Sequence, residues 1–146
     1  MMDTTAYTIG FHLSRASRTM RYYVDRLFAE SEMGDVSMGY IGVLLALYDE
    51  DGRTMSDLSR EVRLEKSTMT GLIERMVRTG LIVRKQDEND RRAQRIWLTE
   101  RGRDVRPGVG RVLERSYSDL TEGLSGKEID KAREVLSTII ENACGK

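Results

Sequence analysis

Side chains suited to binding a polyanion gather in two stretches of the chain, residues 66–78 and 87–95. The first stretch carries one ammonium group, three hydroxyl groups and two guanidinium groups, on Lys66, Ser67, Thr68, Thr70, Arg75 and Arg78. Hydroxyl and guanidinium groups bind phosphates and the hydrogen-bonding edges of bases. The second stretch adds Arg91, Arg92 and Arg95, with Asp90 beside them. These residue types indicate recognition of a nucleic acid.

The second stretch is suited to the minor groove of DNA. A guanidinium enters a narrow groove readily because it sheds water more easily than an ammonium does. Asp90 precedes Arg92 by two residues, so its carboxylate can hold that arginine extended. The alternative is a solvated charged loop whose local ion pairs contribute little.

Residue types that catalysis needs are scarce and scattered. His12 is the one histidine of the sequence and Cys144 is the one cysteine, so no acid–base or nucleophile pair can be proposed. The acidic run at residues 49–52 does not form a calcium loop, because its first and last ligand positions would fall on Leu47 and Leu58. We therefore expect no catalytic residue, no cofactor and no metal site.

Charge is unevenly distributed along a chain whose formal net charge is zero. Residues 53–106 hold 14 Lys and Arg against 9 Asp and Glu, a net charge of +5, so the flanks carry −5. A basic middle between acidic ends favours a polyanionic partner at the middle. No apolar run reaches the length of roughly 18 residues that a membrane span requires, and the N-terminus lacks a signal-peptide pattern. We expect a cytoplasmic protein.

The first polyanion-binding stretch falls on a predicted helix, residues 66–79. Its apolar stripe, at helical spacing, consists of Met69, Leu72, Ile73, Met76 and Val77. The opposite face is centred on Ser67, Gly71, Glu74 and Arg78, with Thr68, Thr70 and Arg75 at its edges. Glu74 is spaced to pair with Arg78 at i+4. Gly80 provides the left-handed residue that ends many helices. Taken alone, the pattern also fits an ordinary amphipathic surface helix.

The neighbouring elements favour the DNA-binding interpretation. A short helix is predicted at residues 54–62, with a capping pattern at its start and a turn at residues 64–65. Two β-branched runs, residues 81–85 and 95–98, predict a hairpin with a long charged tip. The order helix, turn, helix, strand, tip, strand is that of a winged helix-turn-helix.

Helices are also predicted before this region. Residues 1–31 carry one apolar stripe at helical spacing. Residues 38–48 are apolar on most sides and predict a core helix, with Ser37 as its N-cap.

After the hairpin, Thr99 caps a helix predicted to run to about Gly123, and Pro107 inside it predicts a bend. Ser125 and Glu128 form a capping box that opens the last helix. Its apolar seam is Ile129, Ala132, Leu136, Ile139 and Ala143. The stripes of the first and last helices have no partner nearby in the sequence.

Residues 66–104 resemble the signature region of the MarR family of bacterial transcription regulators. They read KSTMTGLIERMVRTGLIVRKQDENDRRAQRIWLTERGRD. The most specific part is the D-x-R sequence from Asp90 to Arg92, followed by LTxxG at residues 98–102. The helix lengths on both sides fit the family along the whole chain.

The resemblance implies a mainly α fold with a small β-hairpin wing, an α+β winged helix-turn-helix. Residues 35–103 would form the DNA-binding domain, with residues 66–79 in the major groove and Arg92, braced by Asp90, in the minor groove. Residues 1–34 and 104–146 would form a helical dimerisation region, in which two chains bury one another's stripes. The expected function is a homodimeric repressor of a pseudo-palindromic operator.

Gly71 departs from the family, whose members often carry a larger, commonly basic, side chain at this place. The recognition code of a relative therefore cannot be transferred to this chain.

The resemblance also implies a small-molecule effector, because many relatives release DNA when a phenolic or anionic compound binds between the dimer helices and the winged domain. Candidate pocket residues are His12, Arg15, Tyr22, Tyr40 and Tyr48, with ordinary packing as the alternative for each. Sensing of oxidants through an N-terminal cysteine is disfavoured, because the single cysteine lies near the C-terminus.

A winged-helix adaptor that contacts proteins and does not bind DNA is the alternative function. The two are distinguished by the charge of the wing and of the helix face. Both carry arginine here, which favours double-stranded DNA as the partner.

Overall fold

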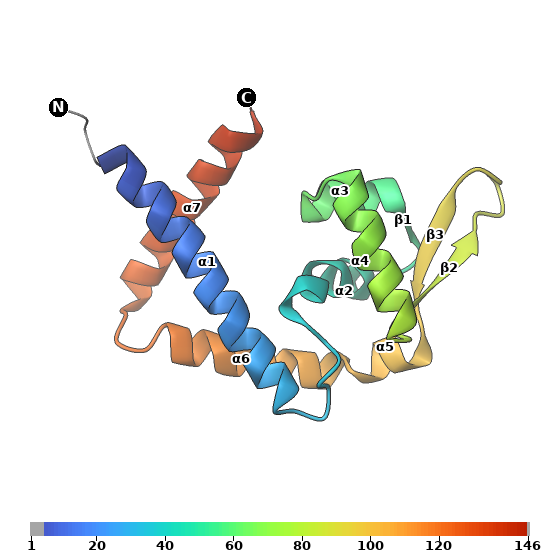
Figure 1. The fold of residues 1–146 in the computed structure, drawn as a ribbon, viewed down its shortest axis with the longest axis horizontal. Coiled ribbons are helices and arrows are strands. Elements are labelled where there is room, and N and C mark those ends of the chain that lie inside the picture. The colour runs from blue at the N-terminus through green and yellow to red at the C-terminus, as the bar shows by residue number, and fades with distance from the viewer. Residues whose placement is uncertain (1–4, 146) are drawn as a thin grey trace.

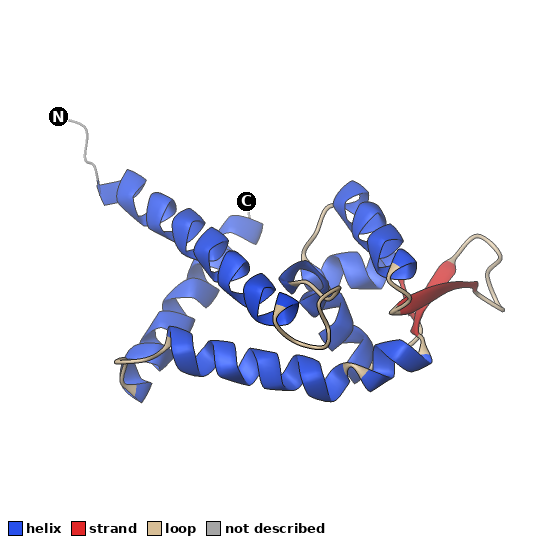
Figure 2. Cartoon of the chain, turned by 60° about the horizontal axis from the view of Figure 1, so that its bottom comes forward, coloured by secondary structure: helices blue, strands red, loops and turns tan. Residues whose placement is uncertain are grey.

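The computed structural model describes residues 5–145 as a mainly helical chain with one small sheet. In order, the elements are α1 (Thr5–Ala29), α2 (Met38–Asp49), β1 (Arg53–Thr54), α3 (Met55–Val62), α4 (Lys66–Arg78), β2 (Ile82–Gln86), β3 (Gln94–Leu98), α5 (Glu100–Asp104), α6 (Arg106–Leu120) and α7 (Gly126–Cys144). Helices α1, α6 and α7 form one side of the molecule, and α2 to α5 with the strands form the other (Figure 1). The strands lie at one end (Figure 2).

Helix α2 is the centre of the core, as its apolar sequence predicts. Six of its twelve residues are buried: Tyr40, Ile41, Val43, Leu44, Ala46 and Leu47. The same cluster includes Phe28 of α1, Ile73 of α4, Ile96 of β3 and Val109 of α6. A single core therefore joins the two sides of the molecule.

The start of α2 is capped from another helix. Ser37 is the N-cap residue of α2, as predicted, but its side chain makes no capping hydrogen bond. Asp25 of α1 takes this place, because its Oδ1 accepts a hydrogen bond from the Met38 N–H at 2.6 Å. A carboxylate at a helix N-terminus is also favoured by the helix dipole, so this contact fixes α1 against α2.

The sheet has three strands in the order β1-β3-β2, where the sequence predicts two. Both pairings are antiparallel, with Arg53 opposite Ile96 and Arg84 also opposite Ile96. Strand β1 has two residues, too few to show an alternating pattern. The additional strand ties the middle of β3 to the start of α3.

The segment LTERG, residues 98–102, joins the end of α4 to the hairpin and α5. The Thr99 N–H donates to the Leu81 carbonyl at 3.0 Å, and its hydroxyl donates to the Gly80 carbonyl at 2.5 Å and accepts from the Gly102 N–H at 3.0 Å. Gly102 itself lies against the Leu81 backbone, where a Cβ would collide with the carbonyl oxygen. The glycine therefore permits the close approach of α5.

The helix predicted after Thr99 is divided in two. Helix α5 ends at Asp104 and α6 begins at Arg106, with Pro107 in the first turn of α6. A proline in a first turn costs no helical hydrogen bond, and the break between the two helices, at Val105, precedes the proline. The predicted capping box of the last helix is confirmed at Ser125 and Glu128.

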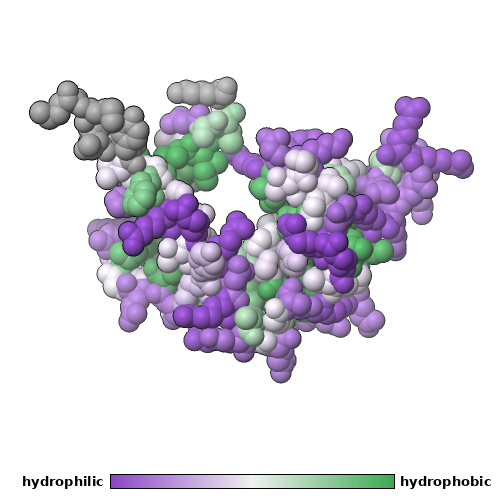
Figure 3. Space-filling view, in the orientation of Figure 1, coloured by the Kyte–Doolittle hydropathy of each residue, from purple (hydrophilic) through white to green (hydrophobic). Residues whose placement is uncertain are grey.

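Much of the surface of α1, α6 and α7 is apolar and open. None of the described residues of α7 is buried. The exposed apolar side chains of α1, α6, α7 and the loop between α6 and α7 are Ile9, Phe11, Met20, Tyr22, Tyr117, Leu120, Leu124, Val135, Leu136 and Ile140. Hydrophobic surface accordingly shows on the arm formed by α1 and α7 (Figure 3). No helix between residues 5 and 145 is long and apolar enough to cross a membrane.

We expect Gly102→Ala to lower the free energy of unfolding by about 1–3 kcal/mol, the usual cost of overpacking. The obstacle is backbone at Leu81, which cannot swing aside as a side chain could. Gly110→Ala in α6 is the matched control, because a Cβ there meets nothing within 4 Å. That change should raise stability by roughly 0.5–1 kcal/mol, since alanine favours a helix. Urea denaturation measures both. Equal midpoints for Gly102→Ala and the unchanged protein would contradict the packing argument.

Candidate nucleic-acid interface

Helix α4 presents a polar face because its apolar face is firmly buried. Met69, Leu72, Ile73 and Met76 are all buried, as the stripe predicts. Val77 departs from the prediction, since 37% of its surface is exposed at the edge of the stripe. The side chains of Lys66, Ser67, Thr68, Glu74, Arg75 and Arg78 are exposed on the remaining surface. The helix is therefore anchored along one side and open to a partner along the other.

The first turn of α4 offers unpaired backbone donors. Its N-cap residue, Glu65, makes no side-chain capping hydrogen bond. The first N–H groups of a helix attract anions when no side chain satisfies them. Ser67 and Thr68 stand exposed at this turn. Thr70, one turn further, turns its hydroxyl to the Lys66 carbonyl at 2.9 Å.

The side chains of Arg75 and Arg78 on α4 are available to bind a partner. The structure records no ion pair between Glu74 and Arg78 among the described residues, although the sequence predicts one. Gly71 lies between the hydroxyl residues and these charges. A Cβ at this position would meet one atom within 4 Å, the Nη1 of Arg75 at 3.6 Å. Space does not require a glycine here, so its absent side chain leaves a gap in the polar face.

The turn before α4 fixes how this helix is presented. Arg63 ends α3 in the left-handed conformation, with φ 55°. The Leu64 N–H then bonds back to the Ser59 carbonyl at 3.1 Å. At its other end α3 is capped by Thr54, whose side chain accepts a hydrogen bond from the Asp57 N–H. Hydrogen bonds at both ends therefore hold the helix-turn-helix geometry.

Asp87 organises the wing tip, a role that the sequence analysis missed. Its Oδ1 accepts hydrogen bonds from the N–H groups of Asn89 at 2.7 Å and Asp90 at 3.0 Å, and its Oδ2 pairs with Arg95. The hydrogen bond from Arg95, followed by those from the two amides, lowers the pKa of Asp87. An aspartate that begins a turn is a known sequence signal, which could have identified this residue.

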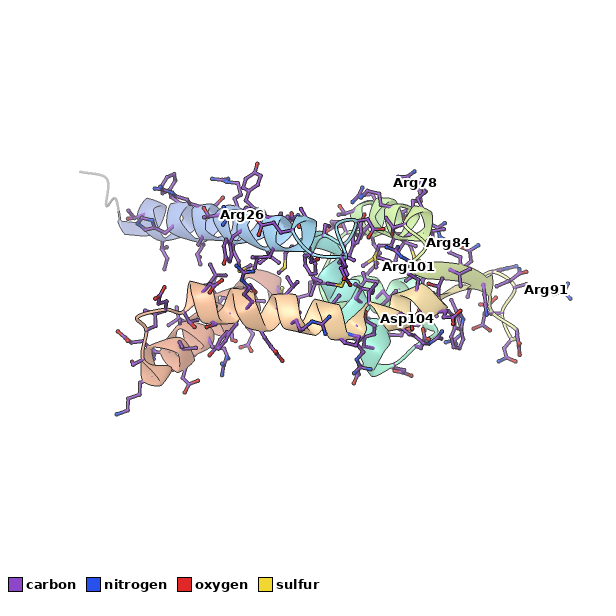
Figure 4. All side chains as sticks on the ribbon, turned by 90° about the horizontal axis from the view of Figure 1, so that it is seen from below. Arg26, Arg78, Arg84, Arg91, Arg101 and Asp104 are labelled. Carbon is purple, nitrogen blue, oxygen red and sulfur yellow. The ribbon has the colours of Figure 1, made fainter. Side chains whose placement is uncertain are left out.

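Asp90 braces the backbone of the tip and not the guanidinium of Arg92. Its Oδ1 accepts a hydrogen bond from the Arg92 N–H at 2.9 Å. The described structure records no ion pair between the Asp90 and Arg92 side chains. Both Arg91 and Arg92 are exposed, and Figure 4 shows Arg91 reaching outward from the wing. The tip therefore presents two arginines on a turn that aspartates hold.

Arg95, which the sequence places with the tip arginines, has a structural role in the fold. It lies in β3, where its Nε pairs with Asp87 and its Nη1 donates to the Gly52 carbonyl at 2.8 Å. These contacts tie the tip to the β1 edge of the sheet. Its guanidinium is thus already bound within the chain at two nitrogens, and its assignment as a DNA contact stays a prediction.

The predicted effector residues do not surround one cavity. His12, Arg15 and Tyr22 are exposed on α1, whereas Tyr40 is buried in the core. Tyr48 donates a hydrogen bond to the Gly102 carbonyl at 2.9 Å and has Arg106 over its ring. A crevice lies elsewhere, between the end of α1 and the start of α6. Its lining is Leu27, Glu30, Ser31, Glu32, Met33, Asp104, Val105, Pro107, Gly108, Arg111, Val112 and Arg115.

Known proteins resemble this chain in sequence and in fold. Residues 35–93 match the model of the MarR family. Over 109 residues the chain is 32% identical to the HTH-type transcriptional regulator SarZ of Staphylococcus epidermidis, which covers 75% of this chain and 70% of SarZ. A MarR transcriptional regulator from Methanosarcina mazei Go1 superposes with a TM-score of 0.80 at 25% identity, covering 95% of this chain and 98% of that one.

A further neighbour was solved with nucleic acid. The transcriptional repressor CouR, bound to a 23-mer DNA duplex, superposes with a TM-score of 0.81, covering 96% of this chain and 97% of CouR. Its sequence identity of 23% makes this a likeness of fold.

We expect Asp87→Asn to speed amide hydrogen exchange at Asn89 and Asp90, because an amide oxygen is a weaker acceptor than a carboxylate. Because the pKa of Asp87 is lowered, its carboxylate stabilises the wing at every pH above the usual aspartate pKa of about 3.9. This contribution is lost as the pH falls through the lowered value, so the two proteins should converge in acid. Glu88→Gln is the control and should not alter exchange. Equal exchange of Asp87→Asn and the unchanged protein at neutral pH would contradict the role of Asp87.

Proposed function

We propose, since the chain belongs to the MarR family of transcriptional regulators, that it represses transcription by binding a specific DNA sequence as a homodimer. The observation that carries this proposal is the polar face of α4, which is exposed beside a wing whose tip carries Arg91 and Arg92. CouR shares the fold and is described as a repressor bound to DNA. Binding and repression by the present chain are our inference from that likeness.

Helix α4 is suited to the major groove. An α-helix fits this groove, where each base pair presents a distinct pattern of donors and acceptors. Ser67 and Thr68 lie at its open first turn, and Arg75 and Arg78 lie further along. We propose that the first-turn residues contribute most to the choice of sequence, since the N-terminal residues of a recognition helix contact base edges.

The wing is suited to the adjacent minor groove. A narrow minor groove attracts arginine through its negative potential. Arg91 and Arg92 are exposed on a tip whose backbone Asp87 and Asp90 hold in place. A turn fixed in this way loses less conformational entropy when it binds.

A second copy of the chain is the proposed partner of the arm helices. Helix α7 has no buried residue among those described. Its apolar side chains Val135, Leu136 and Ile140 are exposed. An apolar helix face normally packs against another element. Residues 1–34 and 104–146 would accordingly form the dimerisation region, and residues 35–103 the DNA-binding domain. Two-fold symmetry would then require a pseudo-palindromic operator.

The crevice between α1 and α6 is the proposed site for a small effector. Leu27, Met33 and Val112 contribute apolar surface to it, whereas Arg111 and Arg115 contribute positive charge. The crevice lies where α1 and α6 join the proposed DNA-binding domain. A ligand bound there would change the angle between these helices and that domain. This location replaces the group of His12, Arg15 and Tyr40.

The unchanged protein should bind one duplex far more tightly than unrelated duplexes, with a steep decline as salt rises. The first duplex to try is the DNA flanking the protein's own gene, followed by a random-sequence pool. Arg92→Ala should weaken binding to every sequence. At 0.1 M salt the loss should be about tenfold for each bound protomer, since each lost cationic contact with the DNA lowers the salt slope by about one. Gel shift at several salt concentrations measures both quantities.

Ser67→Ala on α4 is the variant to compare with Arg92→Ala. It should change which duplex sequences are selected from the random pool. Failure of the unchanged protein to bind any duplex would overturn the proposed function. An unchanged affinity of Arg92→Ala would remove the wing from the interface.

Leu136→Glu should convert the dimer into a monomer, because it places a charge in the apolar seam of α7. Sedimentation equilibrium at micromolar concentration measures this change. Thr138→Glu introduces the same charge at an exposed position of α7 and should leave the dimer intact. A monomeric unchanged protein, or a dimer that survives Leu136→Glu, would contradict the proposed pairing.

A further inference from the structure

Arg84 of β2 has two buried nitrogens without a partner. Its Nε and Nη2 are shielded from solvent and make no hydrogen bond to any described residue. A guanidinium stays charged at every physiological pH. Burying an unpaired charge is unfavourable, and native proteins rarely leave one without a partner. No outside group can reach these two shielded nitrogens, whereas Nη1 is not among the shielded atoms and forms no hydrogen bond with a described residue, so it is the atom open to an anion.

The surroundings of Arg84 do not neutralise it. Arg84 lines a groove between α4 and β2, together with Glu74, Val77, Arg78 and Val83. The carboxylate in this groove is that of Glu74, which forms no recorded ion pair with Arg84 or Arg78 among the residues described. Two arginines of one groove are thus left without an anion.

The position of the groove identifies the anion. With α4 in the major groove and the wing tip in the adjacent minor groove, one sugar–phosphate backbone separates the two. That backbone must cross the gap between α4 and β2, which is where Arg84 lies. In Figure 4, Arg84 stands between Arg78 at the end of α4 and Arg91 at the wing tip. In this view the three side chains lie in a row from α4 to the wing tip.

We propose that Arg84 is a further DNA-binding residue, which receives a backbone phosphate in the groove between α4 and the wing. This inference rests on the proposed function. Packing on one edge of the guanidinium holds it in place before DNA arrives, so little side-chain entropy is lost on binding. A phosphate carries no sequence information, and this contact fixes the distance between the recognition helix and the wing.

The test is Arg84→Met in the full chain, measured for both DNA binding and stability. The probes are a duplex selected from a random pool by the unchanged protein and one unrelated duplex of equal length. For each bound protomer, Arg84→Met should bind both duplexes about tenfold more weakly at 0.1 M salt, with a salt slope smaller by about one. Without DNA its urea midpoint should not fall, because methionine removes an unpaired buried charge.

Two variants serve as controls. Arg26→Met removes an exposed arginine of α1, far from the groove (Figure 4), and should keep the slope of the unchanged protein. Arg84→Lys keeps the charge and should keep most of the slope.

An unchanged slope for Arg84→Met would overturn the proposal. A variant that fails to fold, or that unfolds at clearly lower urea, would also overturn it, because Arg84 would then be a structural residue. Failure of the unchanged protein to bind any duplex would overturn the proposed function as well, whereas loss of binding in Arg92→Ala with no effect of Arg84→Met would overturn this inference alone.

Discussion

The contact between Gly102 and the Leu81 backbone is the constraint on which the candidate interface depends. At this point the end of α4, the start of the hairpin and α5 meet within hydrogen-bonding distance of Thr99. Arg101 extends the junction, since it donates to the Thr79 carbonyl and pairs with Asp35 before α2. The position of the wing relative to α4 is therefore set by backbone contacts, which leaves the exposed side chains free to bind.

Local sequence predicted the elements, whereas long-range pairing determined the details. The stripe of α4, the core character of α2 and the capping box of α7 are each written in residues close together in the chain, and the structure has all three. Strand β1 exists because Arg53 lies opposite Ile96, and the cap of α2 comes from Asp25, thirteen residues before the Met38 amide. No local pattern contains such partners.

The arginines of the candidate site also show that local sequence does not reveal long-range partners. Counting charge between residues 53 and 106 treats every cation alike. In the structure, Arg53, Arg95, Arg101 and Arg103 pair with carboxylates within the fold, whereas Arg75, Arg91 and Arg92 have no such pair among the described residues. The positive charge that can reach a partner is thus smaller than the sequence total, and part of it lies on α4 and the wing tip. Composition correctly indicated the region but could not separate the two roles.

Gly71 has a consequence for how this protein can evolve. The polar face of α4 contains one position where the backbone has no side chain and where a new Cβ would meet a single flexible guanidinium at 3.6 Å. Replacing a glycine inside a helix commonly adds stability of about 0.5–1 kcal/mol. A small side chain here can therefore change the polar face of α4 while it stabilises the helix, so such a change carries no cost in folding.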